Sequence, residues 1–542
     1  MVMYNSISKF GVRKSRIIVA VFFAVFLAVG LSIVKDYGVS WDGPLQRMTG
    51  LITYNYITEG DQSLFFHRDR FYGMVFELFL VSLEKMFGLN DIRPVYLMRH
   101  TVTFLVFYIS VIFFYLLCRD HFKDWKKGLL ACLFLVLSPR IFAHAFYNSK
   151  DLTFLSVFII SVYFMIRYIK NPSSLNAVIH GFVSAVLIDV RILGVMIPAY
   201  TFIFLVLRMI LTGQGIKYTM KTCVSFLIYM VSLTFFTVLF WPFLWEDPLK
   251  YAVESFKRMS KFPQAVVVLY MGDYIRATDL PWHYIPVWLS VTTPVLYLYG
   301  FCAGVLSIVF DFLRKPVIFL REKTSEIVFC LWFFTPLITV IILRSVMYDS
   351  WRHLFFIYPA FIIIAVTGIS RILRAALGGL GRFSSLAGFI VAATVAAGLA
   401  DPLIFMIKYH PFQNVYFNRI AGKDMKEIKN KYDLDYWGLS YIKGLRYILD
   451  HDKRAAIRVL VANDPGQYNA FLLTPAERKR IVFVEKEEDA DYFIGNYRWH
   501  REDYAAGDDE EVFSIRIGNA KILVVYKLNK PLYRPLKVLP AM

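Results

Sequence analysis

The chain is short of charge, and the charge it has is unevenly divided. Only 19% of its 542 residues are Asp, Glu, Lys or Arg, whereas 57% are hydrophobic and the mean hydropathy is +0.51. This composition excludes an ordinary water-soluble protein. The 60 basic residues outnumber the 41 acidic ones, giving a net charge of +19. We do not expect nucleic-acid binding, because the excess lies in short loops between apolar runs and no basic run is interleaved with aromatic residues.

Cysteine is also scarce. The five cysteines lie in or beside apolar runs, and none forms a CxxC pair or the spacing of a metal site. They are therefore interpreted as small buried hydrophobic side chains. At the N-terminus, basic residues precede an apolar run that has no small-residue cleavage site, which predicts a retained first span.

Long apolar runs are what the sequence has in abundance. Runs of about 18–25 residues separated by charged loops are typical of a polytopic α-helical membrane protein. About 11 transmembrane helices are predicted, at roughly 17–35, 94–118, 127–143, 152–169, 175–190, 193–211, 222–241, 285–312, 326–343, 353–370 and 385–407. With the N-terminus in the cytoplasm, the Lys and Arg clusters of the loops fall on one side of the membrane, as the positive-inside rule requires.

The first outer loop is predicted to carry two surface helices. The segment 71–88 is apolar enough to be a span, but it contains Glu77, Glu84 and Lys85. If it crossed the membrane, every later basic cluster would face outward. An amphipathic helix along the outer surface fits better, and 45–58 has a similar pattern.

The character of the chain changes near residue 408. Charged residues become dense, and five short strand-like runs alternate with helix-like stretches. The strands are predicted at 456–461, 480–484, 491–495, 512–517 and 521–526. We therefore predict a membrane module over 1–407 and a small extracytoplasmic α/β domain over 408–542, without a nucleotide fingerprint. A lid or partner-binding cap is the role we favour for this domain.

Asp42 is the carboxylate around which the functional hypothesis is built. It follows directly on the first span, within Lys-Asp-Tyr-Gly-Val-Ser-Trp-Asp-Gly-Pro at 35–44. A carboxylate there lies at the membrane surface, where polar substrates and lipid head groups meet. Two interpretations stay open: a reactive group, or an Asp that merely starts an interfacial helix, since Asp-Gly-Pro is also favourable cap and turn chemistry.

Other ionisable and aromatic residues gather in four later outer loops. Such residues near a membrane core are costly unless they line a cavity, so each is a functional candidate. The candidates are Asp151 as a second catalytic carboxylate, and His144, Lys150, Arg191, Glu246, Trp282, His283, Arg352 and His353 as substrate-binding residues. Local alternatives stay open: an ion pair of Asp189 with Arg191, interfacial tryptophans, and a helix N-cap at Asp151. Together the set predicts a polar cavity that faces outward.

Such a set suits transfer of a sugar from a lipid-phosphate donor. Asp42 is placed to accept the acceptor's proton as its oxygen attacks the anomeric carbon. Lys150, Arg191, Arg352 and His353 could stabilise the departing phosphate, and span faces rich in Phe and Leu could hold an isoprenoid. A direct displacement would invert the anomeric centre.

A first span that leads to an acidic outer loop with two surface helices, and a second acidic site before the fourth span, resemble the GT-C superfamily of membrane glycosyltransferases. Within that superfamily the chain resembles the protein O-mannosyltransferase and aminoarabinose-transferase clan. The resemblance covers roughly residues 10–410, and 410–418 and 435–440 resemble a bacterial branch. Asp42 matches the Asp of the clan's Asp-Glu motif, whereas Gly43 replaces the Glu. That departure puts in doubt the Glu's part in orienting an acceptor or metal.

The resemblance implies a polyprenyl-phosphate-linked monosaccharide donor and transfer at the extracytoplasmic face of a bacterial inner membrane. It leaves open the sugar, a divalent cation, and whether the acceptor is a protein, lipid or glycan. Two rivals remain. A lipid or glycan transporter (a flippase) would place polar sites at the midplane between related halves, which we do not find. A polysaccharide ligase of similar shape would use Arg and His without a catalytic acid.

Overall fold

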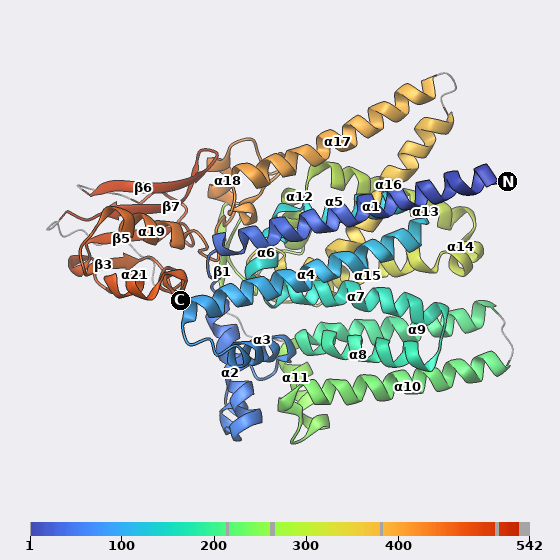
Figure 1. Cartoon of the computed structure of the whole chain (residues 1–542), viewed down its shortest axis with the longest axis horizontal. Helices are drawn as coiled ribbons and strands as arrows, with labels where there is room; N and C mark the ends of the chain where they lie inside the picture. The colour runs from blue at the N-terminus through green and yellow to red at the C-terminus, as the bar shows by residue number, and fades with distance from the viewer. Residues whose placement is uncertain (1, 213–215, 261–265, 380–382, 505–508, 530–542) are drawn as a thin grey trace.

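A bundle of long helices with a small sheet domain at one end makes up this computed structural model, which describes residues 2–212, 216–260, 266–379, 383–504 and 509–529 (Figure 1). In the described part, nine helical segments are long and apolar enough to cross a membrane. They are Lys14–Asp36 (α1 with the 3-10 turn after it), Ile92–Phe122 (α4), Asp151–Lys170 (α7), Ile192–Leu211 (α9 with the 3-10 turn before it), Tyr218–Phe240 (in α10), Val295–Arg314 (α13), Thr324–Ile342 (α15), Arg352–Gly378 (α16 with the 3-10 turn before it) and Ser384–Lys408 (α17). The chain is therefore an integral membrane protein, as its composition predicts.

Proline divides two of the predicted spans. Helices α5 (Trp125–Val136) and α6 (Pro139–Tyr147) meet at an angle of 69°. Pro139 has no N–H and disfavours helical backbone at the residue before it, and Ser138 is extended, with φ −85° and ψ 103°. The predicted span 285–312 likewise separates at Pro294 into α12 (Tyr284–Thr292) and α13.

The predicted span 175–190 is shorter than the nine membrane-crossing segments. It forms α8 (Ser174–Val190), which is apolar but has only 17 residues. Counting the bent pair α5 and α6 as one span gives up to ten crossings among the described residues. The other helices of the membrane module are α1 (Val2–Ile33), α9 (Met196–Thr212), α10 (Ile216–Phe240), α11 (Pro248–Ser260), α14 (Pro316–Glu322) and α16 (Tyr358–Gly379).

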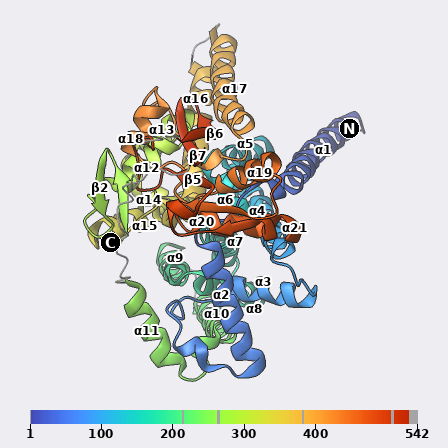
Figure 2. The ribbon, with the colours of Figure 1, turned by 90° about the vertical axis from the view of Figure 1, so that its left-hand side faces the viewer.

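The two predicted surface helices are confirmed as α2 (Gly43–Glu59) and α3 (Val75–Met86). Both run across the long direction of the bundle at the end where the sheet domain lies (Figures 1 and 2). The glutamates of α3 face the protein rather than water. Glu77 receives a hydrogen bond from Arg99 at 2.5 Å, and Glu84 from Arg47 at 2.5 Å. The first ion pair ties α3 to α4 of the bundle, and the second ties α2 to α3.

All five predicted strands are confirmed in the sheet domain, with small differences at their ends. The strands are β3 (Ile457–Val461), β4 (Ile481–Phe483), β5 (Tyr492–Asn496), β6 (Glu510–Ile517) and β7 (Ala520–Lys527), in the order β4-β3-β5-β7-β6. The first three are parallel, and β7 and β6 add an antiparallel hairpin. Helix α19 (Tyr441–His451) packs on this sheet, closely enough that a Cβ at Gly444 would touch Leu523 at 3.1 Å.

Short elements complete this domain and the long outer loop before α12. The helices are α18 (Met425–Lys431), α20 (Pro465–Tyr468) and α21 (Pro475–Arg480). The hairpin of β1 (Val267–Tyr270) and β2 (Asp273–Arg276) was not predicted.

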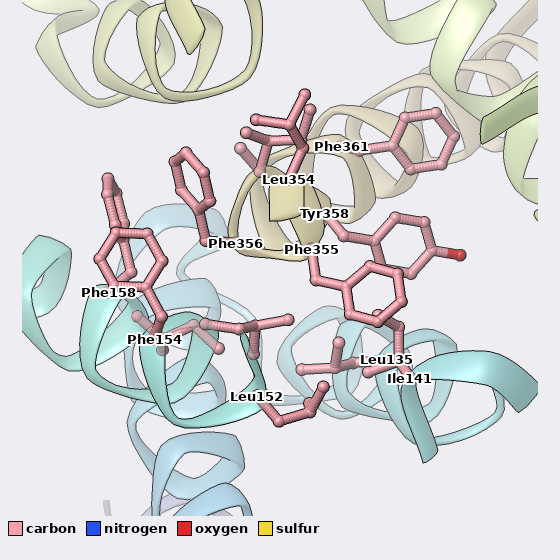
Figure 3. Packing of buried hydrophobic residues seen from close by; sticks show 14 of the residues in the cluster. Leu135, Ile141, Leu152, Phe154, Phe158, Leu354, Phe355, Phe356, Tyr358 and Phe361 are labelled. Carbon is pink, nitrogen blue, oxygen red and sulfur yellow. The ribbon is translucent and has the colours of Figure 1, made fainter. Parts of the chain in front are cut away.

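An aromatic core fixes the relative position of two chain segments that matter for the site. The rings of Phe154 and Phe158 on α7 each lie 4.9 Å from the ring of Phe356, between centroids (Figure 3). Phe356 belongs to a 3-10 turn that begins at Arg352 and leads into α16. Because Asp151 is the first residue of α7, this packing sets Asp151 beside Arg352.

Candidate active site

Asp42 precedes α2, but it does not act as a helix cap. Its side chain makes no capping hydrogen bond with the first turn of α2. Its carboxylate lies instead 3.2 Å from the Nη1 of Arg352 and is 35% exposed. Of the two interpretations left open by the sequence, simple capping therefore does not account for this side chain.

Arg352 is the centre of the charged cluster. Its Nη1 also donates to Asp151 at 3.0 Å, and its Nη2 donates to Asp349 at 3.2 Å. The guanidinium lies over the Trp437 ring, 4.8 Å from the centroid, and is almost fully buried. One cation thus holds three carboxylates together, which mutual repulsion would otherwise drive apart.

Asp151 is buried and engaged on every side. Besides Arg352, it accepts hydrogen bonds from Arg191 and, at 3.1 Å, from the side chain of Asn148. Arg191 therefore pairs with Asp151 and not with its sequence neighbour Asp189. The N-cap interpretation of Asp151 is not what the structure shows, because its carboxylate makes tertiary ion pairs.

The C-terminal domain contributes residues that sequence reasoning missed. Arg498, which follows β5, donates to Asp349 at 2.7 Å and to Asp433 at 3.4 Å. Trp437 donates its indole N–H to the same Asp349 at 3.2 Å. Asp349 is thus bound between an arginine of the membrane module and one of the sheet domain.

Three further predicted residues lie around the cluster. His144 contacts Asn148 at 3.0 Å through Nδ1 and Tyr436 at 3.2 Å through Nε2, so it reaches Asp151 through Asn148. The Lys150 ammonium lies 3.1 Å over the Tyr72 ring and belongs to none of the ion pairs among the described residues. His353 packs its ring 4.7 Å from that of Tyr348.

The remaining three predicted residues do not join the cluster. Glu246 is exposed in the loop before α11. Trp282 is 69% exposed, with its ring against that of His283. A hydrogen bond of 2.6 Å joins the Nδ1 of His283 to the Tyr270 hydroxyl. Among the described residues, no hydrogen bond, ion pair or ring contact joins any of the three to Asp42 or Arg352, and their part in substrate binding stays a prediction.

The loop that carries Asp42 is clamped by the sheet domain. The side chain of Asn469 accepts from the N–H of Val39 and donates to its carbonyl, both at 3.1 Å. A Cβ at Gly38 would lie 2.4 Å from Asn469 Oδ1 and 2.4 Å from the Leu439 carbonyl oxygen. Only glycine fits this approach, so the backbone before Asp42 is fixed by contacts from far along the chain.

The two stretches that resemble a bacterial branch are structural supports. Gln413 accepts from the Tyr37 hydroxyl at 3.1 Å, and His410 meets Asp36 at 3.0 Å. Asn414 donates at 3.2 Å to Asp435, whose carboxylate also accepts from the N–H of Ser440. They tie the exit of the first span to the sheet domain.

The protein environment changes the acidity of two groups in opposite directions. Burial raises the pKa of the Asp42 carboxyl above its ordinary value, although the charge of Arg352 opposes that rise. Burial lowers the pKa of the Lys150 ammonium to about 8, and the nearby charge of Arg191 acts the same way. A carboxyl with a raised pKa is a stronger base than an ordinary aspartate.

The carboxylates of the cluster do not form a metal-binding set. Among the described residues, no group of three or more His, Cys, Asp or Glu side chains is arranged to hold a metal ion. Asp42, Asp151 and Asp349 each face a guanidinium. This arrangement does not fit a divalent cation, because each carboxylate is already neutralised by an arginine.

No family model and no curated protein sequence matches the chain. Solved structures with a similar course of the chain include ArnT from Cupriavidus metallidurans bound to undecaprenyl phosphate, 12% identical, with 93% of this chain and 97% of that chain covered and a TM-score of 0.48. The apo oligosaccharyltransferase of Archaeoglobus fulgidus is 12% identical, with 88% and 70% covered and a TM-score of 0.46. AglB from the same organism, in complex with an inhibitory peptide and a dolichol-phosphate, is 10% identical, with 88% and 70% covered and a TM-score of 0.44. At these values the likeness carries no conclusion about chemistry, for which the side chains of the site are the basis.

Proposed function

We propose that the chain is a membrane glycosyltransferase that moves a monosaccharide from a polyprenyl-phosphate-linked donor to an acceptor. The observation that carries the proposal is Asp42: a carboxylate that is one-third exposed, paired with the buried Arg352, at the end of a bundle of membrane-spanning helices. Asp151 and Asp349 in the same cluster are nearly inaccessible. Asp42 is therefore the carboxylate that a substrate can reach.

The reaction is a single displacement. The hydroxyl oxygen of the acceptor attacks the anomeric carbon of the sugar, and Asp42 accepts the hydroxyl proton. The bond between the anomeric carbon and the phosphate oxygen breaks, and its electron pair leaves with the polyprenyl phosphate. Attack opposite to the leaving group inverts the anomeric centre.

The cations around Asp42 have different parts in this scheme. Arg352 is committed to three carboxylates, so it positions Asp42. Lys150, which makes no ion pair within the described part of the chain, is the cation available to the growing charge on the leaving phosphate, and Arg191 lies next to it. Asp151 sets the geometry of both arginines.

The proposed topology places Asp42 and the sheet domain on the extracytoplasmic side of a bacterial inner membrane and the N-terminus in the cytoplasm. Charge distribution supports it. Basic residues of separate loops, including Lys123, Lys170 and Arg321, gather at the end of the bundle opposite to Asp42. Lys and Arg are enriched in cytoplasmic loops.

A donor-consumption assay tests the proposal. The purified protein in detergent is incubated with a panel of labelled polyprenyl-phosphate monosaccharides, with hydroxyl-bearing acceptors and a membrane extract as acceptor source. We expect one donor to be converted to free polyprenyl phosphate with transfer of its sugar. Movement of intact donor between leaflets of a vesicle, with no donor consumed, would identify a transporter instead.

A further inference from the structure

A second polar site lies at the end of the bundle opposite to Asp42. A cavity of about 400 Å³ is enclosed by the last turns of α4, α7 and α9, by α14, and by the first turn of α15. Helix α7 connects the two sites, since Asp151 begins it and Lys170 ends it. At a rise of 1.5 Å per residue, its 20 residues separate them by about 30 Å, the thickness of the hydrocarbon core of a bilayer.

Positive charge dominates the wall of this cavity. Its cationic side chains are Lys123, Lys170, Arg208, Arg321 and Lys323, against the carboxylates of Asp120, Glu322 and Glu326. Two of these carboxylates are already engaged, Asp120 by Arg119 at 2.8 Å and Glu326 by Lys323 at 3.1 Å.

Three of the cations remain available to a ligand. Lys123, Lys170 and Arg321 belong to none of the ion pairs among the described residues. A smaller adjoining cavity of about 330 Å³, which shares Lys170, adds Arg167 to its wall. An anion entering the cavity therefore meets more positive charge than the protein itself neutralises.

Uncharged hydrogen-bond donors at the start of α15 also favour an anion in this cavity. Helix α15 begins at Thr324 without a side-chain cap, and Thr324 and Ser325 both line the cavity. The first N–H groups of a helix lack partners within it and favour a negative charge. The carbonyl end of α7, which would repel an anion, is occupied because Arg208 donates to the Ile169 carbonyl.

Apolar side chains are exposed on the helices that line the cavity and on α13, which packs against α14. On the same or neighbouring helices, Ile210 of α9 is 72% exposed, Leu313 of α13 71% and Val317 of α14 69%. A soluble phosphate compound would gain nothing from these side chains, whereas acyl chains would cover them. A cationic cavity together with exposed apolar side chains nearby matches the charged headgroup and the acyl chains of an anionic lipid.

We propose that this cavity binds the phosphate headgroup of an anionic phospholipid, with its acyl chains against the exposed apolar side chains of α9, α13 and α14. Lys123, Lys170 and Arg321 contact the phosphate, together with the first turn of α15. The site does not depend on the proposed glycosyl transfer, because it rests on residues about 30 Å away from Asp42.

Lipid titration of the purified full-length chain tests this proposal. Native mass spectrometry and thermal unfolding are followed in uncharged detergent with phosphatidylglycerol, phosphatidylcholine or inorganic phosphate. We expect phosphatidylglycerol to bind and to raise the unfolding temperature, less so at high salt, and phosphatidylcholine to do neither. Equal protection by inorganic phosphate would overturn the lipid assignment, and equal binding of phosphatidylcholine would overturn the charge argument.

Variants locate the bound lipid. The double change Lys170→Ala with Arg321→Ala should weaken phosphatidylglycerol binding roughly thirtyfold, at the usual contribution of each cation near an anionic lipid. The matched control, Arg446→Ala with Lys479→Ala, removes two exposed cations of the sheet domain and should leave binding unchanged. Charge-retaining Lys170→Arg with Arg321→Lys should keep most of the binding and guards against misfolding. Binding that is unaffected by the first pair, or lost equally with the charge-retaining pair, contradicts the proposal.

Discussion

At the scale of single residues, Arg352 determines the charge balance of the candidate site. A buried guanidinium is costly unless every partner is in place, and here Asp42, Asp151 and Asp349 are its partners. Removing the cation leaves Asp151 with Arg191 and Asp349 with Arg498, but it takes away the one guanidinium that all three carboxylates share.

The Arg352→Gln variant should therefore be strongly destabilised, by about 3–5 kcal/mol, the usual cost of breaking a buried ion pair. Thermal or denaturant unfolding of the purified protein in detergent measures this. Arg446→Gln, which removes an exposed arginine from α19, is the control and should change stability by less than about 0.5 kcal/mol. Similar stabilities for the two variants would show that Arg352 does not hold the cluster together.

The two perturbed groups of the site predict a bell-shaped pH dependence of donor turnover. Activity requires Asp42 without its proton, so it falls as pH drops through a pKa that lies above the ordinary 3.8. It also requires the Lys150 ammonium, so it falls as pH rises through about 8. Turnover against pH measures both limits.

Replacing Lys150 by Arg separates the two limits. Arginine keeps its charge at any pH of the assay, so the alkaline fall should disappear while the acid fall stays. An unchanged alkaline fall in Lys150→Arg would assign that limit to another group.

At the scale of elements, tertiary contacts hold the loop between α1 and α2 in a single conformation. The backbone between α1 and α2 is held at Gly38 and Val39 by Asn469, a residue of the sheet domain. Asp42 can therefore be positioned without a capping bond to α2.

Gly38→Ala should disturb this loop, because the added methyl group would lie 2.4 Å from a backbone carbonyl oxygen that cannot rotate away. We expect a loss of about 1–3 kcal/mol in stability and a larger loss in donor turnover. Gly378→Ala in α16, where a Cβ would meet nothing within 4 Å, is the matched control. Normal turnover in Gly38→Ala would mean that the clamp does not position Asp42.

Elements with strong periodicity could be predicted from the sequence, and elements shaped by tertiary contacts could not. The five strands of the sheet domain are short runs rich in Val, Ile, Phe and Tyr, and the sequence places them to within two residues. The bends at Pro139 and Pro294 were missed because apolar runs continue through them. Glu77 and Glu84 indicate a water-exposed face of the helix 75–86. That face is buried instead, because arginines distant in sequence, Arg99 and Arg47, pair with the two glutamates.

At the scale of the whole molecule, the sheet domain is part of the candidate site rather than an appendage. Arg498 binds Asp349 of the membrane module, and the rings of Trp499 and Trp41 lie 5.5 Å apart next to Asp42. Sequence reasoning brought Asp42, Asp151, Arg191 and Arg352 to one side of the membrane. It could not find Arg498, because an arginine in a charged soluble domain carries no local signal of burial.

A double-mutant cycle measures this coupling between the two parts of the chain. Asp349→Asn and Arg498→Met should each lower the unfolding free energy, and the double variant should be less destabilised than their combined effects by about 0.5–3 kcal/mol. The same cycle with the exposed Arg446→Met in place of Arg498→Met should show no coupling. Additive effects of Asp349→Asn and Arg498→Met would mean that this ion pair does not couple the sheet domain to the membrane module.

Consumption of a labelled polyprenyl-phosphate sugar by the Asp42→Asn protein tests the central claim most directly. Asparagine keeps the size of the side chain but cannot accept the acceptor's proton, so turnover should fall by roughly 10²- to 10⁴-fold. Asp450→Asn, at an exposed position of α19, should be fully active. If folded Asp42→Asn protein consumes donor as fast as the unaltered protein, Asp42 is not the base, and a ligase-like reaction without a catalytic acid takes its place.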